Sequence, residues 1–543
     1  MVTKLAENST DYKSSISSSS GFDYETQTYH SLRQPPPLQL PDQTTPLSVT
    51  HYVFTLYNAN LRTNNNSSSN NNDNFLVDAA QRHRLSLFQL QSYVTRLSSS
   101  LRDNIGLKHG DTAFILSPNS IHVPLLYLSL FAIGVIVSPS NPTSSPGEIS
   151  RQMQLTSPVI AFATSETAHK LPSLKHPPVL LDSLQFHSLI STPHSELSKQ
   201  DRVIIRQSDV AAVLYSSGTT GRVKGLWFRV VAMCTVPFFH VYGFFYCLRC
   251  LAFGESLVLF SKFNFQLMMK SIQQFSVTNL ALAPPLVVAM ISNSIGDYDL
   301  RSLQVVLSGG APLSIPLMKK FNTLFPNVTL VQAYGLTETT GGVCRTVGPI
   351  ESKRLGANGR LTYNCQAKIV DPLTGVGLPP FKHGELWIRG PSIMKGYVHD
   401  EMASGAILTA DGWLKTGDLC YFDNEGFLFY VDSIKELIKC NGYQVPPAEL
   451  EDLLQSHPDI VEAAVVPYPD EKAGQVPIAF VVRTTGSIID ESIIKEFVAK
   501  EVAPYKKLRR VSFMDSIPKN ATGKVLRKEL VKLSLSNGTS SRL

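Results

Sequence analysis

Cysteine is scarce in this chain of 543 residues, and the seven that occur are scattered along it. Only Cys247 and Cys250 have C-x-x-C spacing, with no second such pair and no histidine pair at zinc-binding distance. Disulfide-stapled secreted proteins and structural zinc modules need paired, regularly spaced ligands. The composition therefore argues against both classes and predicts a protein of a reducing compartment.

Charge is also sparse. Charged residues make up 17% of the sequence, and the formal net charge is only +6. Nucleic-acid-binding proteins concentrate far more positive charge on one face. We therefore expect no nucleic-acid partner, whereas an anionic small ligand fits this mild excess.

Long uninterrupted apolar runs are missing too. No Asp, Glu, Lys or Arg lies between Asp111 and Glu148, but Pro124 and Gly134 interrupt the apolar stretch. That stretch is shorter than the roughly 20 residues that cross a bilayer. We expect a buried helix and a buried strand there, and no membrane span. The N-terminus has no apolar core of the kind that a secretory signal requires.

Two composition changes divide the chain. Residues 1–75 contain a serine run, three consecutive prolines and an Asn/Ser-rich tract, and we interpret them as a flexible N-terminal extension. From about Phe75, short apolar segments alternate with amphipathic ones, which predicts an α/β fold with parallel sheets covered on both faces. The expected strands are 112–116, 134–137, 159–163, 211–215, 257–260, 279–283 and 305–308.

A second change falls near Asp432. A glycine-rich, aromatic, β-like region at 422–430 precedes it, and a charged stretch follows. Beyond this point we expect a small α/β domain over 432–543, leaving 76–431 as the large domain. Its expected elements are a helix at 448–456, strands at 461–466 and 479–483, a helix at 491–500 and a strand at 511–514.

A loop rich in glycine and hydroxyl groups follows the expected strand at 211–215. From Tyr215 to Gly225 it reads YSSGTTGRVKG. Glycines let successive backbone N–H groups converge on an anion, and Lys224 adds a mobile positive charge. We interpret it as a phosphate-binding loop, although it lacks the G-x-x-x-x-G-K-[ST] pattern of a Walker A motif. The alternative, a flexible linker, fits poorly beside a buried strand.

Six segments in order resemble the motifs of adenylate-forming enzymes, the superfamily of acyl-CoA synthetases, luciferases and peptide-synthetase adenylation domains. Besides the loop, these are FFHVYG at 238–243, SGGAP at 308–312, QAYGLTET at 332–339, WLKTGD at 413–418 and PKNATGK at 518–524. The segments IKELIK at 434–439 and GYQVPPAELE at 442–451 resemble the plant 4-coumarate–CoA ligase branch. SGFD at 20–23 and YHSLR at 29–33 resemble the ligase-like 9 group within it.

The resemblance implies a large domain of stacked α/β/α sheets with a β-rich subdomain, and a small mobile C-terminal α/β domain that swings about Asp432. It also implies an ATP-dependent, Mg²⁺-requiring ligase that joins a carboxylic acid to coenzyme A through an acyl-adenylate. The implied catalytic residues are His240, Lys435 and Lys524, and the implied metal ligand is Glu338. In isolation each would be unremarkable: a lone histidine in an apolar run is more often a satisfied core residue.

The remaining implied site residues fall into three groups. Those expected to bind ATP or AMP are Ser216, Ser217, Gly218, Thr219, Thr220, Lys224, Gln332, Thr337, Asp418 and Ser433. Those expected to line the acyl pocket are Tyr242, Gly310, Ala333 and Tyr334. Those expected to face coenzyme A are Lys262, Lys439, Asn441 and Gly442.

Three positions depart from the family pattern. Ser433 stands where an arginine usually contacts ribose, and Asn441 stands where a second lysine is common on the CoA loop. The third departure is larger, because only fifteen positions separate Gly225 from His240. A covering helix, typically about 11 residues long, and its flanking segments are missing there. We hypothesise that the chain is a skipped-exon or mis-spliced form of an active enzyme.

The chain ends Ser541-Arg542-Leu543, which resembles the Ser-Lys-Leu address read by the peroxisomal import receptor. This predicts a peroxisomal location and favours fatty or oxylipin-type acids over phenylpropanoid acids as substrates. Two other functions stay open. One is a luciferase-like adenylating oxidase, and the other is a catalytically impaired isoform that acts as a binding or regulatory protein.

Overall fold

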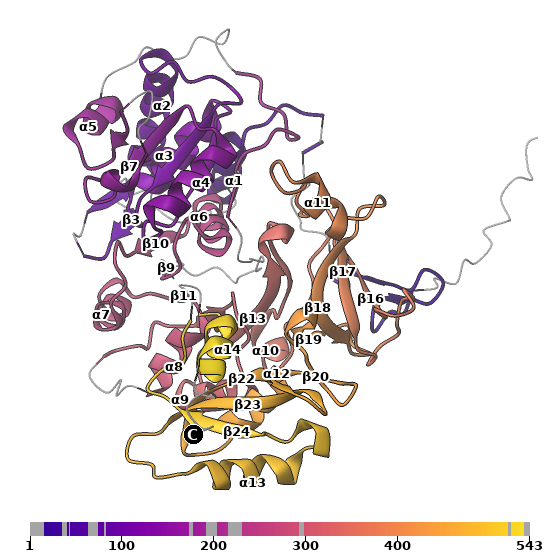
Figure 1. Cartoon of the computed structure of the whole chain (residues 1–543). Coiled ribbons are helices and arrows are strands. Elements are labelled where there is room, and N and C mark those ends of the chain that lie inside the picture. The colour runs from indigo at the N-terminus through magenta and orange to yellow at the C-terminus, as the bar shows by residue number, and fades with distance from the viewer. Residues whose placement is uncertain are drawn as a thin grey trace, which may run out of the picture.

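The computed structural model describes residues 16–34, 41–42, 44–62, 74–80, 83–172, 177–191, 203–215, 231–292, 298–519 and 523–536. Within them the chain forms four sheets, with nine, six, five and four strands. Figure 1 shows the C-terminal sheet at the bottom, the antiparallel sheet of six strands at the right, and the N-terminal helices and strands above. The mixed α/β class expected from the sequence is confirmed.

The nine-stranded sheet runs in the order β15-β14-β13-β12-β11-β9-β10-β3-β4. The strands from β13 to β3 are parallel, and β4, β14 and β15 add antiparallel edges. Most of the residues of its inner strands are buried, because helices cover both faces. The bounds are β3 Asn74–Asp78, β4 Arg84–Ser86, β9 Val231–Cys234, β10 Ser256–Leu259, β11 Asn279–Leu282, β12 Val305–Ser308, β13 Thr329–Leu336, β14 Gly341–Arg345 and β15 Arg360–Leu361.

A second, fully parallel sheet has the order β6-β5-β7-β8, with β5 Thr112–Leu116, β6 Ile136–Pro139, β7 Ile160–Ala163 and β8 Val179–Leu180. The strand expected at 211–215 is wrong: this segment makes only one bridge, between Val137 and Ala212. Val137 N donates to Ala211 O, and Val213 N donates to Val137 O. The next donor along β6 would be Pro139, which has no N–H, so the ladder stops. The other six expected strands form, with ends displaced by no more than two residues.

The six-stranded antiparallel sheet corrects the expectation of a flexible N-terminal extension. Its order is β1-β2-β16-β17-β18-β19, so residues near the N-terminus pair with strands more than 300 residues away. Phe22 and Tyr29 are buried in its core, and the Tyr29 ring stacks on Phe422 at 4.4 Å. The bounds are β1 Phe22–Asp23, β2 Thr28–His30, β16 Gln366–Val370, β17 Gly384–Arg389, β18 Leu414–Phe422 and β19 Leu428–Ser433.

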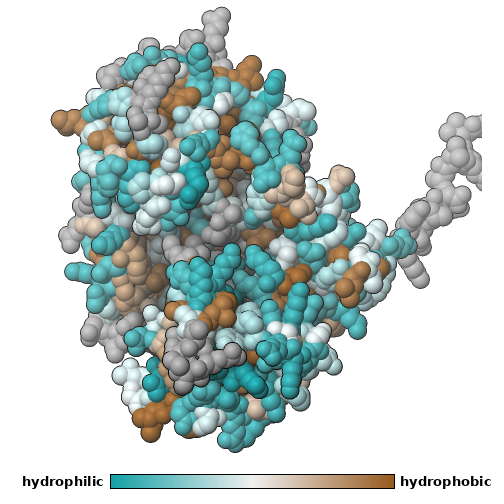
Figure 2. Space-filling view, in the orientation of Figure 1, coloured by the Kyte–Doolittle hydropathy of each residue, from teal (hydrophilic) through white to brown (hydrophobic). Residues whose placement is uncertain are grey.

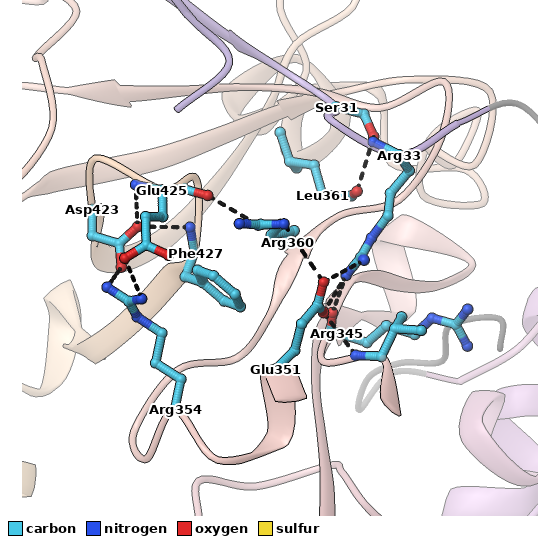
Figure 3. A network of polar contacts seen from close by, with 11 residues as sticks. Ser31, Arg33, Arg345, Glu351, Arg354, Arg360, Leu361, Asp423, Glu425 and Phe427 are labelled. Atoms are coloured by element: carbon cyan, nitrogen blue, oxygen red, sulfur yellow. Dashed lines mark hydrogen bonds and ion pairs between the residues drawn. The ribbon is translucent and has the colours of Figure 1, made fainter. Parts of the chain in front are cut away.

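Arg33 ends this N-terminal segment with an ion pair. Its two terminal nitrogens each lie 2.7 Å from a Glu351 carboxylate oxygen, and one of them also donates to Arg345 O at 2.9 Å. Figure 3 shows these Arg33 contacts beside a second cluster, in which Arg354 forms ion pairs with Asp423 and Glu425. A few aromatic and charged anchors therefore hold a polar segment that composition alone marks as unstructured.

Helix α1, Val49–Arg62, is the second ordered part of the predicted extension. Val53 is buried, and Thr50 Oγ1 donates to Leu128 O at 2.5 Å in helix α3. The Asn/Ser-rich tract at 63–73 lies outside the described residues. The helix packs against its neighbours because its apolar side chains need cover that a helix alone cannot supply.

The C-terminal sheet has the order β21-β20-β23-β22, with β24 added in parallel to β23. Its bounds are β20 Ile438–Cys440, β21 Tyr443–Val445, β22 Ile460–Asp470, β23 Gly474–Arg483 and β24 Arg510–Phe513. The helices α12 Pro447–Gln455, α13 Glu491–Glu501 and α14 Arg527–Ser536 accompany it. The expected helix–strand–strand–helix–strand order is confirmed, and the sheet has two hydrophobic clusters of its own.

The other helices are α2 Leu87–Asp103, α3 His122–Ala132, α4 Pro146–Thr156, α5 Leu184–Ser191, α6 Val241–Phe253, α7 Phe265–Phe275, α8 Pro284–Ser292, α9 Ile315–Leu324, α10 Gly348–Ser352 and α11 Glu401–Ile407. Local sequence sets several of their starts. Ser86 with Gln89, and Ser145 with Glu148, form capping boxes at α2 and α4. The apolar stretch after Asp111 forms the buried α3 and β6, as expected.

No helix in the described part of the chain has the length and apolarity that a membrane crossing requires. All seven cysteines are buried, and none is bonded to another in the structure. The face in Figure 2 is largely hydrophilic over the C-terminal sheet, with apolar residues in small separate patches.

Candidate functional site

Three buried polar atoms without hydrogen-bond partners lie on or just after the inner strands β12 and β13 of the nine-stranded sheet. Ser308 and Gln332 are paired in register at neighbouring positions of the parallel strands β12 and β13. Ser308 Oγ, Gln332 Nε2 and Thr337 Oγ1 are buried and have no hydrogen-bond partner among the described residues. Buried polar groups are nearly always satisfied, so orphans grouped at strand ends indicate a place for a polar ligand.

Asp418 lies at the centre of a second group of predicted residues. Tyr334 Oη donates to Asp418 Oδ2 at 2.6 Å. Burial raises the pKa of Asp418 to about 6, while the Tyr334 hydrogen bond and the charges of Lys524 and Lys435 oppose that rise. Lys435 lies in the 3₁₀ turn after β19, and Lys524 lies in the loop before α14. A buried carboxylate that faces lysines from two separate segments is an arrangement suited to holding a polar ligand between them.

Tyr334 and Ala333 were both expected to line the acyl pocket, which stays a prediction. Successive side chains of a strand point to opposite faces. The Tyr334 hydroxyl is hydrogen-bonded to Asp418, and its ring lies 6.2 Å from the Tyr430 ring. The structure therefore places the Tyr334 side chain beside Asp418.

Ser433 is paired with Asp418 across strands β18 and β19, so its backbone reaches the same site. The next residue back, Asp432, accepts hydrogen bonds from Ser433 N at 2.7 Å and Ala448 N at 2.9 Å. Burial raises the pKa of Asp432 to about 6, opposed by the Ala448 hydrogen bond. Asp432 thus joins the six-stranded sheet to helix α12 of the C-terminal sheet.

Glu338 and Thr337 lie in a single 3₁₀ turn, Thr337–Thr339, directly after β13. Glu338 Oε1 accepts a hydrogen bond from Tyr397 Oη at 2.9 Å, and Met394 N donates to Glu338 O. Among the described residues no group of three or more His, Cys, Asp or Glu side chains could hold a metal ion. A lone carboxylate beside a ligand site nevertheless fits Mg²⁺, which is usually bound through one or two carboxylates and substrate phosphates.

His240 lies at the start of helix α6 and acts as its N-cap. Its Nδ1 accepts from Tyr242 N at 3.2 Å, and burial lowers the pKa of the imidazole to about 4. The ring is therefore neutral at physiological pH. Tyr242 Oη donates to Leu307 O at 2.8 Å, one residue before Ser308. This bond ties the start of α6 to the end of β12.

The glycines after β12 leave room beside Tyr242. A Cβ added at Gly309 would come within 3.6 Å of the Tyr242 ring, and Gly310 has a φ of +88°, which favours glycine. Tyr242 lies at the start of α6 and Gly310 just beyond the end of β12, while the half-buried Ala333 follows Gln332 within β13.

A pocket of about 470 Å³ lies between the six-stranded and C-terminal sheets. Predicted site residues on its wall are Ser433, Lys435 and Lys439. Asn441 and Gly442, both with positive φ, form the tight β20–β21 turn nearby. Lys262 lies between β10 and α7, and its expected role at the CoA site stays a prediction.

The loop that carries Lys524 docks on the large domain. A Cβ added at Gly523 would lie 2.5 Å from Pro285 Cδ, so only glycine allows this approach. Ser314 Oγ, at the N-cap position of α9, makes no capping bond and instead donates to Gln455 Oε1 of α12 at 3.0 Å.

Several predicted residues cannot be placed. Residues 216–230, including Ser216, Ser217, Gly218, Thr219, Thr220 and Lys224, lie outside the described residues. So do the junction after Gly225 and the last seven residues, which include the expected peroxisomal address.

Sequence reasoning missed residues that serve the site from outside its motifs. Asn119 accepts from Phe238 N and donates to Val236 O, which holds the segment that leads to His240. Tyr397 contacts Glu338, and Glu385 accepts from Gly417 N at 3.1 Å. No local pattern marks these residues, because each acts through a contact distant in sequence.

Comparison with known proteins fits this geometry. Residues 64–229 and 226–398 match the family described as AMP-binding enzyme, and residues 449–524 match the AMP-binding enzyme C-terminal domain. The chain is similar to 4-coumarate–CoA ligase-like 9 of Arabidopsis thaliana, with 46% identity over 97% of this chain and 98% of the relative. It is also similar to peroxisomal OPC-8:0-CoA ligase 1 of the same plant, with 41% identity over 96% of this chain and 99% of the relative.

Among solved structures, the fold resembles o-succinylbenzoate CoA synthetase from Bacillus subtilis in complex with the acyl-adenylate intermediate OSB-AMP. The TM-score is 0.72 at 25% identity, covering 88% of this chain and 97% of that one. The sequence-based resemblance to adenylate-forming enzymes is confirmed.

Proposed function

This chain belongs to the AMP-binding enzyme family, and we propose that it is an ATP-dependent carboxylic acid–CoA ligase. In the first step a carboxylate oxygen attacks the α-phosphorus of ATP, forming an acyl-adenylate while pyrophosphate leaves. In the second step the CoA sulfur attacks the acyl carbon, the bond to AMP breaks, and a thioester forms. The observation that carries the proposal is the buried Asp418 of β18, which faces Lys435 in the turn after β19 and Lys524 in the loop before α14.

Nucleotide binding is assigned to β13, to the turn that follows it, and to β18. Asp418, ionised above its pKa of about 6, accepts hydrogen bonds from the ribose hydroxyls. Gln332 Nε2 and Thr337 Oγ1, which lack partners among the described residues, donate to the bound nucleotide. Lys524 and Lys435 offset the negative charge that gathers when a carboxylate meets a phosphate. Ser433 offers backbone groups and a hydroxyl where relatives carry arginine.

Glu338 is the proposed Mg²⁺ ligand. The ion, when bound, neutralises phosphate charge, and the o-succinylbenzoate CoA synthetase of B. subtilis has also been solved with ATP and a magnesium ion. The hydrogen bond from Tyr397 orients the Glu338 carboxylate. Burial and the negative charge of Glu338 raise the pKa of Tyr397 to about 12, so its hydroxyl remains a donor.

The acyl and thiol groups are assigned to the space beside His240 and Tyr242. A neutral imidazole can accept a hydrogen bond at one nitrogen and donate at the other, so it can approach an uncharged thioester or a thiol without a fixed charge. Gly310 and Ala333 leave room for the acyl chain. Lys439, Asn441 and Gly442 would meet CoA after the C-terminal sheet swings about Asp432, which would also bring them toward Lys262.

For the substrate class, we favour fatty or oxylipin-type acids, with phenylpropanoid acids as the alternative. One similar relative is named as a peroxisomal OPC-8:0-CoA ligase, and the Ser-Arg-Leu ending fits the same compartment. A fluorescent protein that carries only these last residues should enter peroxisomes, and a cytosolic signal would contradict the assignment.

A catalytically impaired isoform is the second candidate, and one observation favours it. The family match divides into two parts that overlap at residues 226–229, just after Gly225, where we hypothesise that a covering helix is missing. The alignment with the ligase-like 9 relative spans 555 residues, more than the 543 of this chain, so the relative has positions that this chain lacks.

Carboxylate-dependent ATP–pyrophosphate exchange tests these functions on the purified chain. Exchange with one acid from a panel of fatty, oxylipin-type and cinnamic acids would support ligation and name the substrate class. No exchange, together with activity after the missing segment is restored, would make the chain an impaired isoform. Light emission with an acyl-adenylate and no need for CoA would favour the luciferase-like alternative.

A further inference from the structure

Arg33 is the last anchor of the N-terminal segment, and it does more than close an ion pair. One nitrogen of its guanidinium donates to Arg345 O, while the fork holds both oxygens of Glu351. Glu351 Oε2 in turn accepts from Val347 N at 2.7 Å. Arg33 and Glu351 together therefore hold the backbone on both sides of Thr346.

Thr346 is the residue that holds Gln332. Thr346 N donates to Gln332 O at 2.9 Å, and Gln332 N donates to Thr346 Oγ1 at 3.1 Å. The backbone N–H and C=O of Gln332 are thus both hydrogen-bonded to the same buried residue, Thr346. The Gln332 side-chain Nε2 is buried and has no hydrogen-bond partner among the described residues.

We propose that Arg33 is a positioning residue for nucleotide binding: through Glu351 and the backbone of residues 345–347, it holds Gln332 in place for ATP. The inference rests on the proposed function, because it assigns the unsatisfied Gln332 amide to the nucleotide. A bidentate guanidinium suits this role, since its planar fork fixes direction as well as distance. The ion pair is largely shielded, with the Arg33 and Glu351 side chains 21% and 14% exposed.

The neighbouring cluster provides a matched control. Arg354 also binds two acidic side chains, Asp423 at 2.7 Å and Glu425 at 2.6 Å, and it packs over the Phe427 ring at 4.8 Å. Figure 3 shows the Arg354 cluster on the opposite side of Arg360 from Glu351 and Arg345. Losing Arg354 removes a comparable set of charges without releasing Thr346.

The experiment measures ATP affinity by isothermal titration calorimetry for the full chain and for R33A, R33K and R354A. We expect R33A to weaken ATP binding about tenfold, the size of one lost hydrogen bond to a ligand. R33K, which keeps the charge without the fork, should fall between R33A and the parent chain. R354A should bind ATP as the parent does. Equal ATP affinity in R33A and the parent overturns the proposal.

Hydrogen exchange of the backbone amides of Gln332 and Thr346 separates this inference from the proposed function. Faster exchange there in R33A, but not in R354A, is the expected result even without added nucleotide. If the parent chain binds no ATP, the proposed ligase function fails, and unchanged exchange in R33A overturns the positioning role independently. A fall in melting temperature common to both variants, with no difference in ATP affinity or in local exchange, would reduce Arg33 to a structural ion pair.

Discussion

The N-terminal segment 16–34 and the C-terminal sheet with its helices, residues 438–536, are attached to the molecule in opposite ways. The N-terminal segment has little structure of its own, yet Phe22, Tyr29 and Arg33 bury it in another sheet. The C-terminal sheet has its own hydrophobic clusters and meets the large domain through contacts such as Ser314–Gln455 and Gly523–Pro285. A segment with little secondary structure can therefore be firmly packed, while a sheet with its own core can be joined to the rest by few contacts.

This difference has a physical cause. Burying an aromatic ring against a sheet core removes a large apolar area from water, a gain that is lost if the segment detaches. A single hydrogen bond between side chains contributes only about 0.5–1.5 kcal/mol, because water replaces it when it breaks. The first attachment suits a fixed element, and the second suits the swing of the C-terminal sheet that the proposed function requires.

The strongest test of the fixed attachment is Tyr29→Ala. Tyr29 is fully buried, and its hydroxyl donates to Leu378 O. Removing the ring should lower the free energy of unfolding by about 3–5 kcal/mol, as for other buried aromatic residues. Urea denaturation measures the change. Leu373→Ala, at a residue 95% exposed in the turn that follows β16 of the same sheet, should cost almost nothing, and a similar loss in both would contradict the anchoring role.

Asp418→Asn tests the proposed nucleotide site on β18. This strand belongs to the six-stranded sheet, which binds the N-terminal segment and continues through β19 toward the C-terminal sheet. The asparagine keeps the size but loses the charge and one acceptor, so both ribose hydroxyls can no longer be bound equally well. We expect ATP–pyrophosphate exchange to fall on the order of 100-fold, comparable to losing a charged hydrogen bond worth about 3 kcal/mol. Circular dichroism should show an unchanged fold. Undiminished exchange would remove Asp418 from the site.

The pH dependence of ATP binding sharpens that assignment. Burial raises the pKa of Asp418 to about 6, so the carboxylate is protonated below that value and ionised above it. ATP affinity should therefore decrease as the pH falls from 7.5 to 5.5. Tyr334→Phe removes a hydrogen bond that favours the ionised form, so it should move the midpoint to higher pH. A midpoint that stays in place in this variant would contradict the assignment of the titration to Asp418.

The smallest expected effect concerns the hydrogen bond between Ser314 and Gln455, which joins the large domain to the C-terminal sheet. Ser314→Ala removes the hydrogen bond to Gln455 without uncapping α9, because Ser314 makes no side-chain cap there. We expect adenylation to slow by about two- to fivefold relative to thioester formation from a preformed adenylate, with an unchanged melting temperature. Ser314→Thr should restore the ratio. A lower melting temperature with an unchanged ratio would mean that Ser314 serves only its own helix.

Sequence patterns predicted a large part of this architecture. Apolar runs located β5, β7, β11 and β12, and Ser–x–x–Gln/Glu patterns set the starts of α2 and α4. Ordered motifs placed Gln332, Thr337 and Glu338 together, because neighbours in sequence remain neighbours at the end of one strand. These features depend on local geometry and periodicity, which a sequence displays directly.

The tertiary structure alone decided the rest. Whether 211–215 forms a strand depended on its partner Pro139, which cannot donate a hydrogen bond. Composition marked residues 1–75 as a flexible extension, but Tyr29 and Arg33 meet partners more than 300 positions away. The hydrogen bond from Tyr334 to Asp418 also follows from packing between two sheets. Such contacts join residues distant along the chain, so no local pattern records them, whereas helices, strands and motifs are determined by residues close in sequence.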